Sequence, residues 1–270
     1  MIIPQLILSD IDGTLLNDQH KLLSSVKNAI RHYVQKGGLF CLASARPAKA
    51  MFVLASQMNL KVPLATLNGA YIIKFDQNKT ILFEQPLLNK STMQIIQIIK
   101  KNHLKISLNL YSGEDWFIEH PNYWSSQEAE ITQIKPSLID FNSIYNQKKI
   151  HKILCMGQSQ VIKQLSNLLA RKTQLKITTS RSKPTYLEIT DQSVSKFAAL
   201  KHLSAYFSIP LNKTMALGDG DNDLTMIKKA GIGIALANAS PALLANADFI
   251  VPSNNDGGVA FALEKYVQNK

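Results

Sequence analysis

The feature that most constrains the fold is an alternation of short apolar runs and helical patterns at both ends of the chain. Each run has the length of a single buried strand, and the segment that follows has the periodicity of a helix. Strands that alternate with helices favour a parallel sheet with right-handed crossover connections. We therefore expect an α/β fold with a Rossmann-like, doubly wound parallel sheet. Its expected strands lie at residues 6–8, 39–43, 64–67, 214–217, 232–236 and 249–251.

Residues that favour helix starts and turns lie between the expected strands of this core. Serine and aspartate side chains can cap helix N-termini, and glycine is common just after a helix ends. Residues 71–83 also predict a hairpin that turns at residues 76–78. The expected helix starts are Ser24 or Ser25, Arg46-Pro47, Ser193 or Ser195, and Asp221.

The pattern of apolar and polar residues changes between residues 87 and 190. Alternating strands are mixed here with two helical segments, which is typical of an α+β domain. We therefore expect a discontinuous core at residues 1–86 and 191–270, with an inserted α+β cap at residues 87–190. The expected cap strands lie near residues 106–110, 115–118, 151–155 and 186–190, and the helices near residues 91–101 and 161–169.

Basic residues are in excess over acidic ones. The 270-residue chain has a formal net charge of +11 and a pI of about 9.5. Residues 87–190 hold 14 Lys and Arg and 7 Asp and Glu, whereas the rest of the chain holds 16 and 12. An excess of this kind attracts anions such as phosphorylated metabolites, nucleic acid or an anionic membrane. A basic insert suits a lid over an anionic substrate, and it equally suits a solvated surface.

Composition also argues against several classes of protein. Cys41 and Cys155 each lie in an apolar run, which predicts two buried thiols rather than a disulfide or a zinc site. The N-terminal residues lack the basic region and cleavage site of a signal peptide. The weakly polar stretch at residues 230–251 contains too many polar side chains to span a membrane. We therefore expect a soluble cytoplasmic protein that does not act at a membrane.

Two carboxylates follow the first expected strand, in the segment Asp10-Ile11-Asp12-Gly13-Thr14. A pair of carboxylates two residues apart often occurs in surface turns. Directly after a buried strand, however, both can face the crevice where open α/β sheets bind their ligands. One carboxylate can then act as a nucleophile while the other transfers protons.

Two further positions could bind an anion near this crevice. Ser44 ends an expected strand before a helix, where its hydroxyl and the following amides can hold phosphate oxygens. Taken alone, a serine before a helix is more often a plain helix cap. Lys196 lies at an expected helix N-terminus, where the helix dipole disfavours a cation unless an anion is near. Taken alone, Lys196 is better explained as a surface lysine.

An acidic cluster follows the strand at residues 214–217, in Gly218-Asp219-Gly220-Asp221-Asn222-Asp223. Its carboxylates repel one another unless a cation or hydrogen bonds compensate. Oxygen ligands of this kind suit Mg²⁺. A calcium-binding EF-hand loop is the alternative, but its spacing and its closing glutamate are absent from this segment.

Together these segments resemble the haloacid dehalogenase-like (HAD) phosphatases, and within them the Cof-type branch with a large α/β (type IIB) cap. The resemblance extends over essentially the whole chain and is most specific at the two acidic motifs. Weaker similarities to the branch occur at Leu67-Asn68-Gly69-Ala70-Tyr71, Ala237-Asn238-Ala239 and Asn255-Asp256-Gly257-Gly258-Val259.

The resemblance implies a role for each site residue. Asp10 would be the nucleophile and form an aspartyl-phosphate, and Asp12 would protonate the leaving alcohol and then activate water. Mg²⁺ would be held by Asp10, the backbone carbonyl of Asp12 and Asp219, with Asp223 nearby. The residues that would bind phosphate are Ser44, Ala45, Arg46, Lys196 and Asn222, the last of which could instead orient Lys196.

Two positions depart from the pattern of the branch. Ser44-Ala45-Arg46 stands where the branch usually has Thr-Gly-Arg, so the hydroxyl is kept but a methyl group is added. Ala45 could therefore weaken phosphate binding if the backbone must approach closely. Phe197 follows Lys196 where glycine is common, and it could narrow the pocket or pack into the core.

The sequence thus predicts a Mg²⁺-dependent phosphatase for a small phosphorylated metabolite, such as a sugar phosphate or a phosphorylated cofactor. A phosphosugar mutase with the same nucleophile is an alternative, and so is a non-catalytic protein that binds a phosphometabolite. No recognisable nucleic-acid motif is present, so we expect no nucleic-acid partner. We expect a monomer or a homodimer. The cap aromatic residues Trp116, Tyr123 and Trp124 could contact substrate or form cap core.

Overall fold

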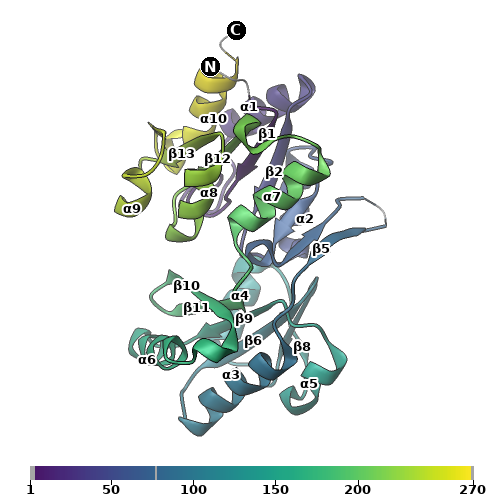
Figure 1. Ribbon diagram of the computed structural model, residues 1–270, viewed down its shortest axis with the longest axis vertical. Helices are drawn as coiled ribbons and strands as arrows, with labels where there is room; N and C mark the ends of the chain where they lie inside the picture. Colours follow the sequence, from purple (N-terminus) through teal and green to yellow (C-terminus); the bar gives the residue numbers. More distant parts are fainter. Residues whose placement is uncertain (1–3, 77, 269–270) are drawn as a thin grey trace. The chain divides into compact units, whose positions relative to one another are not determined.

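The computed structural model describes residues 4–76 and 78–268. For residues 145, 146, 267 and 268 it describes the backbone but not the side chains. The chain forms two compact units (Figure 1). Unit 1 comprises residues 1–45, 51–83 and 195–270, and unit 2 comprises residues 46–50 and 84–194. Unit 1 is therefore assembled from both ends of the chain. Its role as a catalytic core, and that of unit 2 as a cap, stay predictions.

Unit 1 contains an eight-stranded sheet in the order β14-β13-β12-β1-β2-β3-β4-β5. Neighbouring strands from β14 to β3 pair in parallel, and β4 pairs antiparallel with β3. The α/β fold with a largely parallel sheet is thus confirmed. The strands are β1 (Leu6–Ser9), β2 (Leu39–Ala43), β3 (Leu64–Thr66), β4 (Tyr71–Ile73), β5 (Ile81–Glu84), β12 (Thr214–Gly218), β13 (Ile232–Leu236) and β14 (Phe249–Val251).

Helices cover both faces of this sheet because the chain winds outward from β1 in two directions. Right-handed crossovers toward β2 place helices on one face, and those toward β13 place them on the other. Helix α1 packs with α10, and α7 packs with α8. The helices of unit 1 are α1 (Ser24–Gln35), α2 (Ala48–Gln57), α7 (Lys196–Tyr206), α8 (Leu224–Lys229), α9 (Pro241–Leu244) and α10 (Gly258–Leu263).

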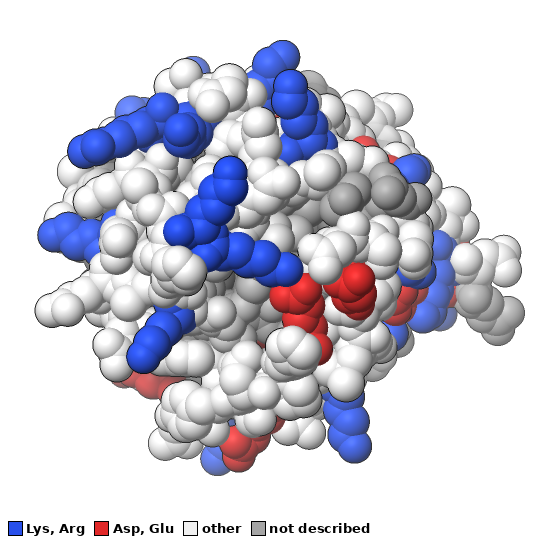
Figure 2. All heavy atoms as spheres, turned by 90° about the horizontal axis from the view of Figure 1, so that it is seen from below, with Lys and Arg blue, Asp and Glu red and all other residues white. Residues whose placement is uncertain are grey.

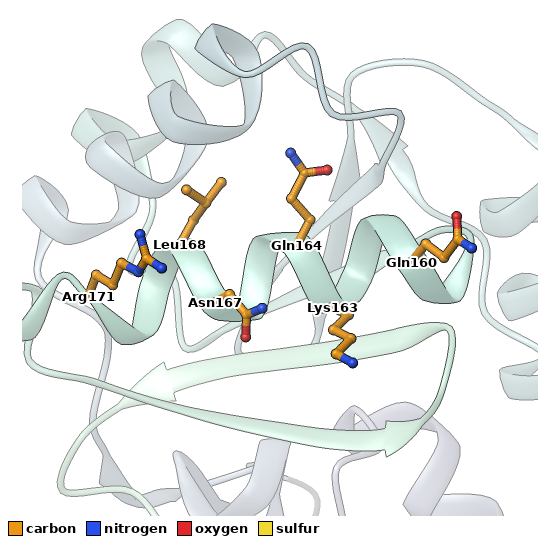
Figure 3. A pocket seen from close by; sticks show the side chains of 6 residues that line it. All are labelled: Gln160, Lys163, Gln164, Asn167, Leu168 and Arg171. Atoms are coloured by element: carbon orange, nitrogen blue, oxygen red, sulfur yellow. The ribbon is translucent and has the colours of Figure 1, made fainter.

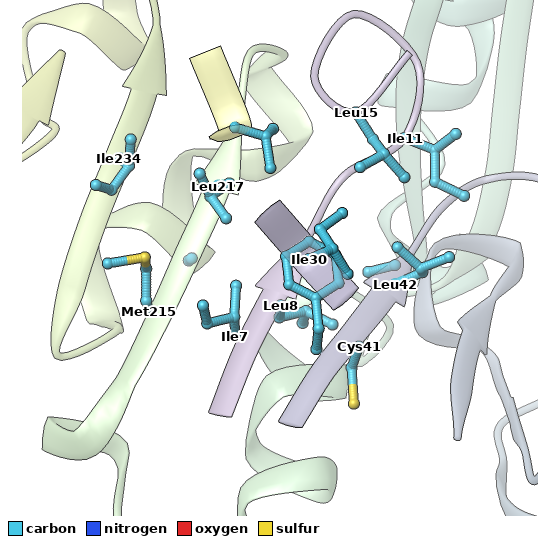
Figure 4. Close-up of a cluster of buried hydrophobic side chains, with 14 of the residues drawn as sticks. Ile7, Leu8, Ile11, Leu15, Ile30, Cys41, Leu42, Met215, Leu217 and Ile234 are labelled. Atoms are coloured by element: carbon cyan, nitrogen blue, oxygen red, sulfur yellow. The ribbon is translucent and has the colours of Figure 1, made fainter. Parts of the chain in front are cut away.

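Strand β1 lies at the centre of the hydrophobic core. Its residue Leu8 is paired in register with Ala216 on one side and Cys41 on the other. Around it, Ile30 from α1 and Leu217 from β12 are fully buried (Figure 4). A strand buried on both faces must be apolar throughout, which explains why its run in the sequence is continuous. The packing fixes the strand ends from which the polar side chains project.

Unit 2 is built on a six-stranded sheet in the order β10-β11-β9-β6-β7-β8. The pairs are antiparallel except for the parallel pair β7 and β8. The strands are β6 (Ser107–Ser112), β7 (Asp115–Ile118), β8 (Ser137–Leu138), β9 (Lys152–Met156), β10 (Ile177–Lys183) and β11 (Tyr186–Asp191). The helices are α3 (Asn89–Lys101), α4 (Tyr123–Thr132), α5 (Phe141–Gln147) and α6 (Ser159–Ala170).

The two faces of this sheet differ in polarity. Alternate residues such as Ile153 and Leu187 form an apolar cluster with residues of α3 and α6. The intervening residues carry buried polar groups, among them Asn109, which accepts a hydrogen bond from Trp116 Nε1 at 3.1 Å. Trp116 is thus part of the interior of unit 2, whereas Tyr123 is exposed.

Two expected helix caps differ in the structure. Residue Leu23 occupies the N-cap of α1, and no side chain caps that helix, so the prediction for Ser24 or Ser25 was wrong. Asp221 does not cap α8; its carboxylate accepts a hydrogen bond from Ser240 Oγ at 2.6 Å. The prediction for Ser195 is confirmed, because its hydroxyl accepts a hydrogen bond from the Ala198 amide at 3.0 Å.

Three smaller predictions can also be compared with the structure. Cys41 and Cys155 are free, buried thiols, as expected. The hairpin is present as β4 and β5, joined by a hydrogen bond from the Lys74 amide to the Thr80 carbonyl at 2.8 Å, although residue 77 of its turn lies outside the described residues. Within the described parts of the chain, no helix is both long and apolar enough to cross a membrane.

Two buried tyrosines on the polar face of unit 2 give a test of this packing. Tyr186 donates a hydrogen bond to Glu128 Oε2 at 3.0 Å, whereas the Tyr111 hydroxyl has no hydrogen-bond partner among the described residues. We expect Tyr186→Phe to lower the free energy of unfolding by about 1–3 kcal/mol, because a buried carboxylate loses its donor. We expect Tyr111→Phe to change it by less than about 0.5 kcal/mol or to raise it.

Urea unfolding of both variants measures this difference. The Tyr111 ring stacks with Trp116 at 5.9 Å between centroids and lies under Lys152 Nζ at 4.6 Å, and phenylalanine keeps both contacts. Equal losses in the two variants would contradict the assignment of the Glu128 hydrogen bond as the stabilising contact.

Candidate active site

Three polar segments meet because the strands that precede them are neighbours. Strand β1 pairs in parallel with β12 on one side and β2 on the other. The amide of Asp10 bonds to the Leu217 carbonyl at 2.9 Å, which continues the ladder by one residue. Asp10, Ser44 and Asp219 therefore follow the carboxyl ends of three adjacent strands. This is the edge at which open α/β sheets bind their ligands.

Lys196 joins this edge from the first turn of α7. Its side chain is almost fully buried, and Nζ donates to Asp10 Oδ1 at 2.5 Å and to Asp223 Oδ1 at 2.6 Å. The Ser195 cap fixes the start of the helix and hence the point from which the lysine extends. Lys196 is thus a buried cation held between two carboxylates, and its explanation as a surface lysine is excluded.

The acidic loop after β12 is folded around Asp223. This side chain is fully buried, and its Oδ2 accepts hydrogen bonds from the amides of Asp219 and Gly220, both at 3.1 Å. Asp219 is held separately, because Thr14 Oγ1 donates to its Oδ1 at 2.6 Å. Each carboxylate of the loop is therefore oriented by donors before any ligand binds.

Burial and charge perturb the titration of these groups. Burial raises the pKa of Asp10 well above its ordinary value, and the ammonium of Lys196 opposes this shift only in part. Burial likewise raises the pKa of Asp219, against the hydrogen bond from Thr14. Burial alone would lower the pKa of Lys196, but Asp10 and Asp223 together raise it. With all three carboxylates ionised, the site would therefore hold more negative charge than one lysine compensates.

The carboxylates of Asp10, Asp219 and Asp223 form a group that could hold a metal ion. Their oxygen atoms lie within 4.8 Å of one another. Gly13 lies against this group at φ +83°, and a Cβ atom there would come within 2.3 Å of Asp219 Oδ2. Glycine at this position therefore keeps the space beside the carboxylate open. Three oxygen donors with uncompensated charge fit a hard divalent cation.

The predicted phosphate-binding residues are placed less uniformly. Ser44 is buried directly after β2, with its amide bonded to the Ala65 carbonyl at 3.0 Å. Ala45 is half-buried beside it, and Arg46 belongs to unit 2. Asn222 is exposed next to Asp223. The sequence left open whether Asn222 binds phosphate or orients Lys196. The neighbouring side chain of Asp223 is the one that contacts Lys196.

Asp12 lies apart from the buried carboxylates. Its side chain is 42% exposed, and Oδ1 is 3.4 Å from Nδ1 of His20. The carboxylate oxygens that come together are those of Asp10, Asp219 and Asp223. The two aspartates of the first motif therefore have different environments, and their division of work stays a prediction.

Some supporting residues had not been singled out from the sequence. Thr14 orients Asp219, and Asn238 Nδ2 donates to the Gly13 carbonyl at 2.8 Å. Both lie in segments that resembled the family pattern, and that pattern was the available signal for them. Phe197, which had been open between pocket and core, packs against the hydrophobic core of unit 1.

Other surface features lack this chemistry. A pocket of about 340 Å³ in unit 2 is lined by side chains of α6 and the residue after it (Figure 3). None of its lining residues is a carboxylate, a thiol or a hydroxyl, the lining being Gln160, Lys163, Gln164, Asn167, Leu168 and Arg171. On the face drawn in Figure 2, Lys and Arg side chains are spread among uncharged residues, and those near the centre of the view adjoin one another beside acidic side chains.

Comparison with known proteins identifies the family. The model of the haloacid dehalogenase-like hydrolase family matches residues 7–263. The chain belongs to this family. A Bacillus subtilis relative named 5-amino-6-(5-phospho-D-ribitylamino)uracil phosphatase is 28% identical, and the match covers 97% of this chain and 96% of that protein. The resemblance deduced from the acidic motifs is thus confirmed.

Solved HAD structures share the fold over nearly the whole chain. A haloacid dehalogenase-like hydrolase from Bacteroides thetaiotaomicron is 28% identical, with a TM-score of 0.87 and coverage of 97% of this chain and 99% of that one. A sugar phosphatase of HAD subclass IIB is 21% identical, with a TM-score of 0.82 and coverage of 96% and 98%. The inserted unit is therefore part of the shared HAD fold.

The excess negative charge of the site predicts that the buried carboxylate of Asp10 lowers the stability of the folded protein. We expect Asp10→Asn to raise the free energy of unfolding of the metal-free protein by about 1–3 kcal/mol at pH 7, since a poorly compensated buried charge is removed. A raised pKa means that the folded state binds this proton more tightly than the unfolded state. The stability of the native protein must then fall as the pH rises through the raised pKa of Asp10.

Urea unfolding across a pH series in a chelator measures the effect. The gain in Asp10→Asn should vanish below about pH 3.9, where aspartate is protonated in both states. Asp221→Asn, which alters an exposed carboxylate of the acidic loop, is the matched control and should show no gain. A loss of stability in Asp10→Asn at pH 7 would show that Lys196 compensates Asp10 fully.

Proposed function

We propose that the chain is a Mg²⁺-dependent phosphatase that hydrolyses phosphate monoesters of small metabolites through an aspartyl-phosphate on Asp10. The observation that carries this proposal is the buried arrangement of Asp10, Lys196, Asp219 and Asp223 at the carboxyl end of the sheet. A carboxylate nucleophile and an anionic ester repel each other, so the site must supply positive charge. A buried lysine and three carboxylates arranged for a cation meet that need.

The covalent steps are assigned to the two aspartates of the first motif. A carboxylate oxygen of Asp10 attacks phosphorus, the ester P–O bond breaks, and Asp12 gives its proton to the departing alcohol oxygen. Asp12 then takes a proton from water, whose oxygen attacks the phosphorus of the aspartyl-phosphate and releases phosphate and free Asp10. Asp12 is half-exposed and can exchange protons with solvent, which supports its assignment to proton transfer.

The other residues hold charge and orient groups. Bound Mg²⁺ would be held by Asp10, the Asp12 backbone carbonyl and Asp219, with Asp223 nearby, and would offset negative charge on the phosphoryl oxygens. Lys196 is positioned to offset the same charge. The proposed phosphate-binding residues are Ser44, Ala45, Arg46, Lys196 and Asn222.

The substrate class is proposed from the basic insert and the relatives. The net positive charge of residues 87–190 suits an anionic metabolite. One relative is named for a phosphorylated ribityl compound and one solved structure for sugar phosphates. We therefore propose a sugar phosphate or a phosphorylated cofactor as the substrate, with unit 2 as the cap that selects it.

Hydrolysis of 4-nitrophenyl phosphate tests the nucleophile. We expect Asp10→Asn to lower kcat by at least about 10³-fold, because the attacking group is lost while the charge cluster is otherwise kept. Asp221→Asn, from the exposed part of the acidic loop, should retain activity within about threefold. Equal rates in the native protein and Asp10→Asn would exclude the proposed reaction.

Removal of the cation tests the metal. We expect a chelator to abolish hydrolysis and added Mg²⁺ to restore it, because the phosphoryl charge is then compensated again. Calorimetric titration should show Mg²⁺ affinity at least about tenfold weaker in Asp219→Asn than in the native protein, while Asp221→Asn binds normally. Full activity in excess chelator would contradict a metal requirement.

A further inference from the structure

His20 lies beside the carboxylate to which we assign proton transfer. Its Nδ1 atom is 3.4 Å from Asp12 Oδ1, and both side chains are partly exposed. Among residues outside glycine, few adopt a positive φ without a local reason, yet His20 has a φ of +56°. The direction in which the His20 side chain leaves the backbone is therefore set by a particular turn, which the neighbouring residues must hold.

The turn that carries His20 is closed by Asn17. The Asn17 side-chain oxygen accepts hydrogen bonds from the amides of Gln19 and Lys21, at 3.0 and 2.9 Å. The His20 amide donates to the Asn17 carbonyl at 2.8 Å, and the Asn17 amide donates to the Lys21 carbonyl at 3.1 Å. Four hydrogen bonds across five residues define one conformation for this exposed segment, with His20 at its left-handed position.

The same turn is attached to a distant segment of unit 1. Asn254 Nδ2 donates to Asp18 Oδ1 and to the Leu16 carbonyl, both at 3.0 Å. Asn255 Nδ2 donates to Asp18 Oδ2 at 2.9 Å, and the Asp18 amide donates to Asn255 Oδ1 at 3.1 Å. The turn is therefore braced by hydrogen bonds to residues 254 and 255 as well as closed by hydrogen bonds of its own.

We propose that His20 is a positioning residue that holds the carboxylate of Asp12 in place for proton transfer to the leaving group. The proposal deepens the phosphatase function proposed above and rests on it. A half-exposed carboxylate can sample several rotamers, and each unproductive rotamer lowers the fraction of molecules ready to transfer the proton. The contact with the imidazole, which extends from the braced turn, restricts this freedom. Its Nδ1–H can donate to the carboxylate in either charge state of the ring.

The test uses esters whose leaving groups differ in their need for a proton. The leaving groups of 4-nitrophenyl, phenyl and benzyl phosphate are successively more basic, so dependence on a general acid increases along the series. The ratio kcat/KM reports the steps through loss of the alcohol and is insensitive to the later release of phosphate. If His20 acts through Asp12, replacement of His20 must lower kcat/KM most with benzyl phosphate.

Two substitutions separate the imidazole from the backbone turn. His20→Gly removes the ring and accepts a positive φ, and it should lower kcat/KM for benzyl phosphate about tenfold, with less than a twofold change for 4-nitrophenyl phosphate. His20→Asn keeps a tolerated left-handed residue and places an amide donor near the position of Nδ1, so it should recover much of the loss. Asp12→Asn gives the full leaving-group dependence for comparison.

The matched control is His103→Gly, since His103 is an exposed histidine of unit 2 that also has a positive φ, of +50°. It should leave all three esters unaffected. A uniform loss across the series in His20→Gly, a gain with benzyl phosphate, or no change would each overturn the positioning role. Absence of Asp10-dependent hydrolysis in the native protein would instead overturn the phosphatase assignment, and the role of His20 with it.

Discussion

The buried ammonium of Lys196 is the contact on which the rest of the site depends. It joins Asp10 and Asp223, which come from opposite ends of the chain, and Asp10 and Lys196 are 186 positions apart in the sequence. A charge removed from water must be paired closely. The two core segments must therefore assemble correctly around the insert before these charges can be buried. The same contact thus connects chain topology to the chemistry of the site.

The charges at this site do not cancel, and that imbalance has a functional meaning. Three carboxylates face one lysine, and the pKa of Asp10 is raised by burial despite the lysine beside it. A structural ion pair would be expected to be balanced, because residual buried charge costs stability. Here the residual charge is fixed by backbone amides and by Thr14. Preorganised excess charge of this kind is typical of a site in which a bound ligand supplies the missing opposite charge.

The sequence predicted the core well because burial on both faces of a parallel sheet demands continuous apolar runs. It predicted unit 2 less well. Strand β10 is largely exposed and has no apolar run, and Asn122 and Asp140 were not recognised from the sequence as the N-caps of helices α4 and α5. The acidic motifs located Asp10 and Asp219. The contact of Lys196 with Asp223 and that of Asp12 with His20 depend on side-chain direction and on a left-handed turn, which no periodicity reveals.

The first motif shows how two identical residues acquire different surroundings, which suit the different roles proposed for them. Asp10 and Asp12 are separated by one residue, yet the Asp10 side chain is 10% exposed beside a lysine, whereas the Asp12 side chain is 42% exposed beside a histidine. Gly13 at φ +83° turns the chain immediately after Asp12. An attacking carboxylate needs a fixed, dry surrounding, while an acid–base carboxylate must recover or lose its proton in each turnover. The turn after β1 provides both environments within three residues of sequence.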